Sequence, residues 1–249
     1  MKTHVKIYAA LIVLAITLLP GCSKDNLFDC FTGAGKIVTE QRTASPFGGI
    51  VLNNNLDLYI TQGPDYSISV EAGKNLQKNI KTEINDGVLT ISNENTCNWV
   101  RSYDKPMNVY ITCVDLDSII YQSSGNIHTL NTLTTDSIKV LVKEGAGLID
   151  MNINTHKSYF QLNEGTVDLE VRGYSDVVYL SSNSYGLANC LDLQANFIYM
   201  SSGSTNDCYV QVNLEFLVVI ENVGNVYYTG DPGTLEYTRN SSGELIKLN

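Results

Sequence analysis

The chain is poor in basic residues, histidine and tryptophan: it has 16 Lys+Arg against 26 Asp+Glu, three His and one Trp in 249 residues. With a formal net charge of −10, it shows no cluster of Lys and Arg that could neutralise phosphates, so nucleic acid is not an expected partner. The only long apolar run lies at the N-terminus and heptads are absent, which excludes a many-span membrane protein and a coiled coil. The remaining composition, 43% hydrophobic with 5 Pro, is that of a globular protein.

The N-terminus carries the pattern of an export signal. Lys2 and Lys6 precede the apolar stretch 9–19, which has the length of a signal-peptide core. The following Leu19-Pro20-Gly21-Cys22 resembles the bacterial lipobox, in which the cysteine is lipidated and becomes the first mature residue. We therefore expect a signal peptide over 1–21, lipidation at Cys22, a tether over 22–35 and attachment to a membrane through the lipid. The alternative is a plain secretory signal with a chance cysteine.

Five cysteines remain after Cys22, which leaves an odd thiol in an oxidising compartment. Cys113 ends an alternating run and is predicted to be buried. Cys30 and Cys97 lie in irregular polar stretches and are the favoured disulfide pair. Alternation places Cys190 outward and Cys208 inward, so a bridge between those two is less favoured.

The second half of the chain repeats at about twenty residues. The Ser-Ser-Gly or Ser-Ser-Asn turn occurs at 123–125, 181–183, 201–203 and 241–243, and Glu-Gly pairs at 144–145 and 164–165 fill missing positions. Strand-like segments with period-two alternation surround each turn, and no helical period is present. An antiparallel sandwich has similar strands but does not repeat its turns in step. The pattern therefore predicts an all-β solenoid with about 20 residues per coil.

The preceding part, residues 36–115, is rich in strands without keeping the repeat. Asn85-Asp86-Gly87 predicts a hairpin turn, and residues 75–81 are expected to form one short helical turn. We expect this part to cap the N-terminal end of the solenoid, because an open edge invites pairing with another chain. No linker separates it from the repeats over 116–249, which predicts one domain over 36–249.

Several segments carry a family resemblance. Phe47-Gly48-Gly49-Ile50, the run 58–63, Gly87-Val88-Leu89-Thr90-Ile91, the Ser-Gly turns and the run 224–232 together resemble the head GIN domain of the family described as "putative auto-transporter adhesin". The resemblance covers roughly residues 36–249 and implies a right-handed parallel β-helix, in a secreted protein or lipoprotein of Gram-negative bacteria. Here several Gly-Ser-Gly turns are replaced by Glu-Gly or Ser-Asn. The resemblance brings no catalytic residues.

Motifs that carry chemistry are missing. No metalloprotease, nucleophile-elbow, phosphate-loop or dinucleotide motif is present, and His128 and His156 are expected to be surface residues, so no catalytic, cofactor or metal site is expected. The alternative is a carbohydrate-active β-helix enzyme with carboxylates on one outer face. Its candidate residues are Asp115, Asp117, Asp136, Asp150, Asp168, Glu170 and Asp192.

Aromatic residues offer the remaining candidates. Tyr121, Tyr179 and Tyr199 are spaced as if they shared one repeat position, and an inward core column is the favoured interpretation over an outward binding stripe. The segment with Trp99, Arg101 and Tyr103 is the candidate contact site.

Together these features predict a non-catalytic adhesion, binding or scaffold module of the cell envelope. We expect it to be an outer-membrane lipoprotein that faces the periplasm or the cell surface. Its ligand, a glycan or a protein, is open, and an oligomer is possible.

Overall fold

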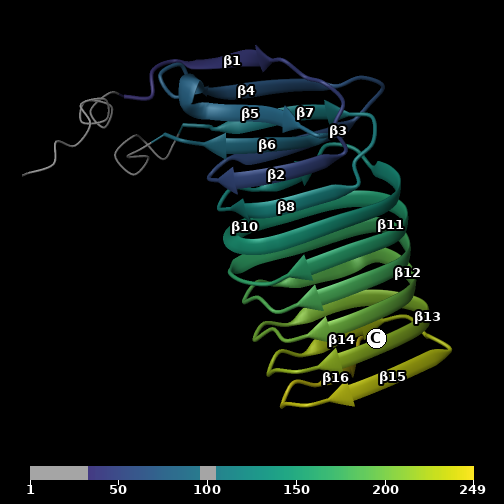
Figure 1. Ribbon diagram of the computed structural model, residues 1–249. Helices are drawn as coiled ribbons and strands as arrows, with labels where there is room; N and C mark the ends of the chain where they lie inside the picture. The colour runs from purple at the N-terminus through teal and green to yellow at the C-terminus, as the bar shows by residue number, and fades with distance from the viewer. Residues whose placement is uncertain (1–32, 96–104) are drawn as a thin grey trace, which may run out of the picture. The chain divides into compact units, whose positions relative to one another are not determined.

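Parallel strands dominate the described part of the chain, which comprises residues 33–95 and 105–249 of a computed structural model (Figure 1). By its internal contacts the chain separates into two units, and the second, residues 34–95 with 104–249, is the one described below. Cys22, Cys30, Cys97, Trp99, Arg101 and Tyr103 all lie outside the described residues, as does the predicted signal peptide over 1–21.

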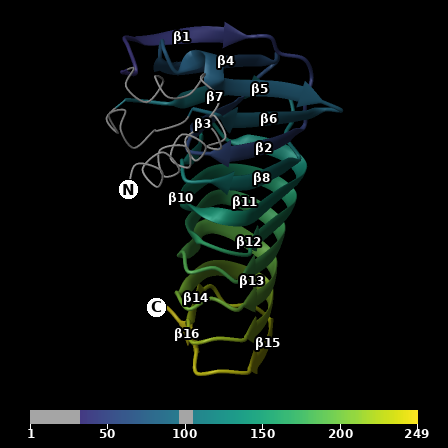
Figure 2. The same ribbon diagram turned by 60° about the vertical axis from the view of Figure 1, so that its left-hand side comes forward.

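The strands form two ladders that face each other across the core (Figures 1 and 2). The first ladder contains β5 (Ile80–Asn85), β6 (Val88–Asn93), β2 (Gly49–Asn54), β8 (Ser118–Ser123), parts of the long strands β10 to β13, and β15 (Thr234–Arg239). The second ladder contains β1 (Ile37–Arg42), β4 (Ser67–Gly73), β7 (Asn108–Cys113), β3 (Asp57–Gln62), β9 (Ile127–Thr129), the other parts of β10 to β13, β14 (Val226–Thr229) and β16 (Leu245–Lys247).

Four long strands run through both ladders because each turns a corner of the coil. They are β10 (Leu133–Leu162), β11 (Thr166–Ser182), β12 (Ala188–Ser202) and β13 (Cys208–Ile220). In β11, for example, residues 166–175 pair with β10 residues 146–155 on the second ladder, and residues 177–182 pair with 157–162 on the first. The chain therefore winds as a parallel β-helix, as the repeat predicted.

The core is built from columns of equivalent apolar residues. Phe160 pairs with Leu180, Leu180 with Met200 and Met200 with Val218, so successive coils differ by 18 to 20 residues. All four side chains are at most 4% exposed. Stacking like residues at one strand spacing fills the interior, and this explains why the sequence alternates apolar and polar residues.

At the N-terminal end the strands run antiparallel, as predicted for a cap. β4 pairs antiparallel with β1 and β7, and β5 pairs antiparallel with β6. The β5–β6 hairpin turns at Asp86 and Gly87, with φ of 49° and 76°, which are values of a type I′ turn. The short helical turn is also present, as the 3₁₀ helix η2 (Gln77–Asn79).

The spatial order of the first coils differs from their order in the sequence. The β2–β3 coil, first along the chain, lies between the β6–β7 coil and the β8–β9 coil, because β2 pairs with both β6 and β8 and β3 pairs with both β7 and β9. The antiparallel strands β4 and β5 carry the chain back to the N-terminal side before β6 begins. Turn signals alone do not specify this reversal.

Two glycines occupy the predicted Glu-Gly positions: Gly165 lies in a bend between β10 and β11, as predicted, whereas Gly145 lies within β10 and not in a turn. Gly145 and Gly165 have φ of 137° and 101°, in the region that favours glycine. A Cβ atom on Gly165 would lie 2.0 Å from the Gly145 carbonyl oxygen, so the stacked coils leave no room for a side chain.

The three described cysteines are buried thiols. This confirms the prediction for Cys113 and corrects the one for Cys190, which is 2% exposed rather than outward. Cys208 lies opposite Ala188, two residues from Cys190, so the two Cα atoms are about 8 Å apart, too far for a disulfide. Burial raises the pKa of the Cys113 thiol to about 11 and that of Cys190 to about 12, which keeps both thiols protonated and unreactive.

The C-terminal end differs from the N-terminal end. All six residues of β15 are exposed, and within the described residues this strand pairs on one side only, with β13. Leu235 lies opposite the buried Phe216 but is 44% exposed, because no further coil covers it. Among the described residues, none of the helices is long and apolar enough to cross a membrane.

This difference between coils gives a stability prediction. Phe216→Ala should lower the free energy of unfolding by about 3–5 kcal/mol, since it leaves a cavity in the core. Leu235→Ala, in the same column, should cost only about 0.5 kcal/mol because its side chain is already in water. Denaturant unfolding of both variants measures the two effects. Equal losses would contradict the assignment of Leu235 to an open end.

Candidate functional site

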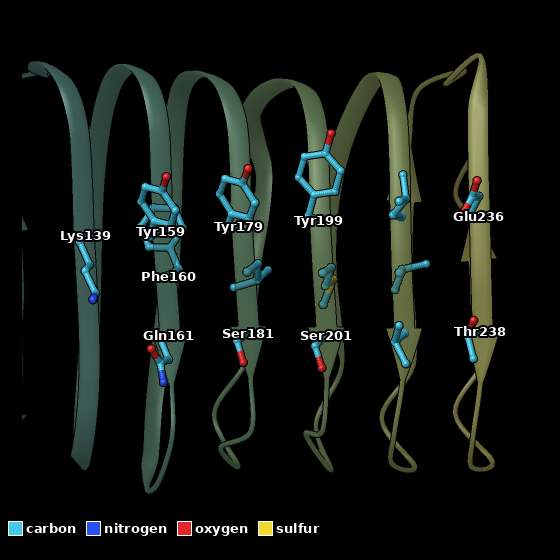
Figure 3. Close-up of a pocket in the computed structure, with 15 residues that line it drawn as sticks. Lys139, Tyr159, Phe160, Gln161, Tyr179, Ser181, Tyr199, Ser201, Glu236 and Thr238 are labelled. Atoms are coloured by element: carbon cyan, nitrogen blue, oxygen red, sulfur yellow. The ribbon is translucent and has the colours of Figure 1, made fainter.

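The outer surface of the first ladder carries a row of tyrosines. Tyr159 pairs with Tyr179 and Tyr179 with Tyr199, and all three side chains point away from the core (Figure 3). Tyr179 is 39% exposed. The core interpretation of Tyr179 and Tyr199 is therefore wrong.

Tyr121 does lie in the core and is fully buried. Tyr121 pairs with Val142, just before a bulge at residue 143. Val142 is followed in the next two coils by Leu162 and Ser182, so Tyr121 belongs to their column. Its hydroxyl donates a hydrogen bond to the Gly125 carbonyl at 2.6 Å, and burial raises its pKa to about 12. The third member of the outer row is Tyr159. Its position is indicated by the sequence, because Tyr159, Tyr179 and Tyr199 follow one another at intervals of 20 residues.

The three rings lie parallel to one another. The centroids of Tyr159 and Tyr179 are 4.8 Å apart with 4° between the ring planes, and those of Tyr179 and Tyr199 are 5.2 Å apart at 24°. Parallel aromatic rings prefer an offset arrangement over a full sandwich. Figure 3 shows the three ring outlines side by side, so each ring leaves part of its face uncovered. We call Tyr159, Tyr179 and Tyr199 the tyrosine row.

A groove of about 550 Å³ runs along this row, across the strands. Its second wall is a row two residues further along each strand, in which Gln161, Ser181, Ser201 and Thr238 are polar and Val219, between Ser201 and Thr238, is apolar. Figure 3 shows the four polar members. The strand backbone between the two rows forms the floor, because the intervening side chains, such as Leu180, are buried. This backbone is hydrogen-bonded within the sheet, so ligand contacts must come from the walls.

Charged side chains stand at the two ends of the groove. Lys139 lies beyond Tyr159, and Glu236 lies on β15 beyond Leu217. Glu215 accepts a hydrogen bond from the Tyr199 hydroxyl at 2.8 Å, and this bond raises the pKa of Tyr199. The middle of the groove is thus aromatic on one side and uncharged polar on the other.

The second ladder carries a different outer column. The ring of Tyr59 stacks on Tyr110 at 4.8 Å and on His128 at 5.4 Å. His128 Nδ1 lies 3.3 Å from Asp150 Oδ2, and Arg172 lies 2.6 Å from Asp150 Oδ1. Partial burial alone would raise the pKa of Asp150, but the hydrogen bonds from Arg172 and His128 outweigh it and hold that pKa below 3.8. Asp150 is therefore a stable anion and unsuited to act as a general acid.

Asp168, another candidate carboxylate, has a structural partner. At one corner of the coil, Asp and Asn side chains accept a hydrogen bond from a backbone N–H of the next coil, at 2.7 to 2.9 Å. These acceptors are Asp57, Asn126, Asp168, Asp207 and Asn225. Asp168 is thereby explained as a corner residue that ties its coil to Leu187.

The remaining histidine lies at another corner. His156 Nδ1 is 3.3 Å from Asp176 Oδ2, beside a shallow recess of about 540 Å³ that Asp136 and Tyr174 also line. Within residues 33–95 and 105–249, no group of His, Cys, Asp and Glu has the arrangement of a metal site.

The ion pairs of Asp150 predict a pH-dependent stability. A carboxyl with a lowered folded pKa stabilises the fold above its ordinary value of 3.8, and the contribution is lost as the pH falls through the folded pKa. Asp150→Asn should therefore lower the denaturation midpoint at pH 7, and the difference from the parent should shrink below pH 3.8. Asp65→Asn, at an exposed turn, is the control. A difference that stays constant with pH would contradict the assignment.

Solved structures share this fold. The chain is similar to a "putative adhesin" from Bacteroides fragilis, with a TM-score of 0.78 and 21% identity over 86% of this chain and 97% of that one. A "putative adhesin" from Parabacteroides distasonis gives a TM-score of 0.64 at 16% identity, covering 87% and 98%. A "putative lipid binding protein" from the same species gives 0.61 at 18%, with the same coverage. At these identities the likeness establishes the fold.

Sequence comparison establishes the family. No functionally curated protein matches the chain. The model of one family matches residues 46–232, which is most of the chain and includes the whole tyrosine row. The chain therefore belongs to the family described as "Putative auto-transporter adhesin, head GIN domain".

Proposed function

We propose that the protein is a non-catalytic adhesion or binding module of the cell envelope, and that the groove beside the tyrosine row is its contact surface. The observation that carries this proposal is the outward row of three tyrosines facing a row of small polar side chains. Aromatic residues with one polar end are typical of contact surfaces, because they offer a large rigid area at little entropic cost. A family described as an adhesin fits such a surface and an extracytoplasmic location.

The groove supports binding better than catalysis. Hydrolysis of a glycosidic bond needs two carboxyl groups on either side of the bond, one of them kept protonated by burial. Glu236 is the one carboxylate among the residues that line the groove, and it stands on β15, where every residue is exposed. Glu215, near the same end, already accepts the Tyr199 hydroxyl.

Attachment to the membrane is part of the proposal. The apolar stretch 9–19 followed by Leu19-Pro20-Gly21-Cys22 supports lipidation at Cys22 and an outer-membrane location. Residues 22–35 would then join the lipid to the solenoid, with the groove facing the periplasm or the cell exterior. Since all sixteen described strands belong to one sheet, lipidation outside it should not alter the fold.

The anchor has a direct test. Cys22→Ser should release the protein from the membrane fraction of the producing cells while its circular dichroism spectrum and melting temperature stay those of the parent. Cys30→Ser is the matched control, because it removes a nearby cysteine outside the lipobox and should leave the protein in the membrane fraction. A Cys22→Ser protein that still sediments with membranes would refute the lipid anchor.

The contact surface is tested separately with the Cys22→Ser protein on an array of glycans and extracellular-matrix proteins. Tyr179→Ala should weaken the saturable binding of the parent about tenfold, since it opens a gap in the middle of the tyrosine row. Tyr185→Ala, which removes a tyrosine that is 65% exposed outside the groove, should not.

A second pair of variants separates the two candidate surfaces. If Trp99→Ala with Tyr103→Ala weakens binding and Tyr179→Ala does not, the contact site is the segment containing Trp99, Arg101 and Tyr103, and the assignment of the groove is wrong. A parent protein that binds nothing on the array would count against an adhesin.

A further inference from the structure

We propose that the ligand of the groove is a linear, uncharged polysaccharide that lies along the stack of coils, perpendicular to the strands. This inference rests on the proposed function, because it names the ligand class of the same site. It depends on three properties of the groove: its repeat distance, its two unlike walls and the position of its charges.

The repeat distance favours a sugar chain over a peptide. The tyrosine rings recur every 4.8 to 5.2 Å, which is close to the length of one pyranose unit in an extended glycan. An extended peptide advances about 3.3 Å per residue, so its side chains would fall out of step with the rings. A peptide strand also could not add to the sheet here, because the backbone of the floor is already paired on both sides.

The two walls match the two kinds of surface on a sugar ring. The partly uncovered tyrosine faces can pack against the C–H groups of a pyranose. Across the floor, the hydroxyls of Ser181, Ser201 and Thr238 and the amide of Gln161 offer both donors and acceptors to sugar hydroxyls. A lipid acyl chain would displace water from these polar groups without offering any hydrogen bond in return, which costs free energy.

The charges favour a neutral chain. Between Lys139 and Glu236 the residues that line the groove carry no charge, so the site has no cation for each uronate or sulfate of an acidic polysaccharide. The net charge of −10 further opposes a polyanion. From Tyr159 to Glu236 the groove crosses four strand spacings, about 19 Å, which several sugar units would fill.

Calorimetric titration of the Cys22→Ser protein tests the inference. The probes are neutral, linear β-linked gluco- and manno-oligosaccharides, from disaccharide to octasaccharide. Affinity should rise with length and level off once the chain fills the groove. Tyr179→Ala should weaken binding about tenfold, Tyr179→Phe should retain most of it because the ring remains, and Tyr185→Ala should leave it unchanged. Thermal unfolding of each variant confirms that it is folded.

Parallel arms use oligogalacturonate, an extended polar peptide and phosphatidylcholine vesicles. If one of these binds in a Tyr179-dependent manner and the neutral oligosaccharides do not, the ligand class is wrong while the groove stands as a contact surface. If neutral oligosaccharides bind equally well to Tyr179→Ala, both the ligand site and the proposed contact surface are wrong. Affinity that does not depend on chain length would overturn the lengthwise orientation.

Discussion

The hydrogen-bonded register between successive coils is the constraint on which the rest of the structure depends. Each parallel strand pairs with its equivalent one coil away, so outside the bulges a residue in the middle of the stack has a fixed neighbour above and below at about 4.8 Å. A residue type repeated in the sequence therefore becomes a column in space. The core column of Phe160 and Leu180, the tyrosine row and the Asp and Asn acceptors at one corner are three results of that single spacing.

The same constraint decides which chemistry a column can carry. Aromatic rings stack in a column and amide or carboxylate groups can accept a backbone N–H from the next coil, whereas unpaired like charges at this spacing repel. Asp150, for example, lies opposite His128 in one neighbouring coil and opposite Glu170 in the other, where Arg172, two residues further along β11, contacts it at 2.6 Å. The Asp150 side chain is thus paired across coils, with His128 on one side and Arg172 on the other.

The sequence predicted the fold more fully than it predicted the site, and register is the reason. The turn residues and the period near twenty are local signals, and so is the Asn85-Asp86-Gly87 hairpin; each is visible without knowing which strands pair. Side-chain direction, in contrast, reverses at every bulge. The register shift between Cys190 and Gln194 places Cys190 and Leu193 both inside, although strict alternation puts them on opposite faces. The coil from Tyr121 to its partner Val142 has 21 residues, and the next two have 20 each, so Tyr121 shares a column with Ser182 and not with Tyr179. The insertion of the β2–β3 coil between later coils depends on pairings too distant in sequence for any local pattern to reveal.

The fold does not require the tyrosine row, and this supports the proposed binding role. The same outer column continues from Tyr199 to Leu217 and Glu236 without any break in the strand pairing, so the backbone does not require aromatic side chains there. Stacking contributes about 0.5–1.5 kcal/mol per pair, which is small beside the burial of the core columns. The outer positions of a solenoid are free of the packing demands of the interior. The fold therefore does not dictate three adjacent tyrosines that face Gln161, Ser181 and Ser201. In a repeating fold, outer side chains that stability does not require are the positions at which a binding surface can form.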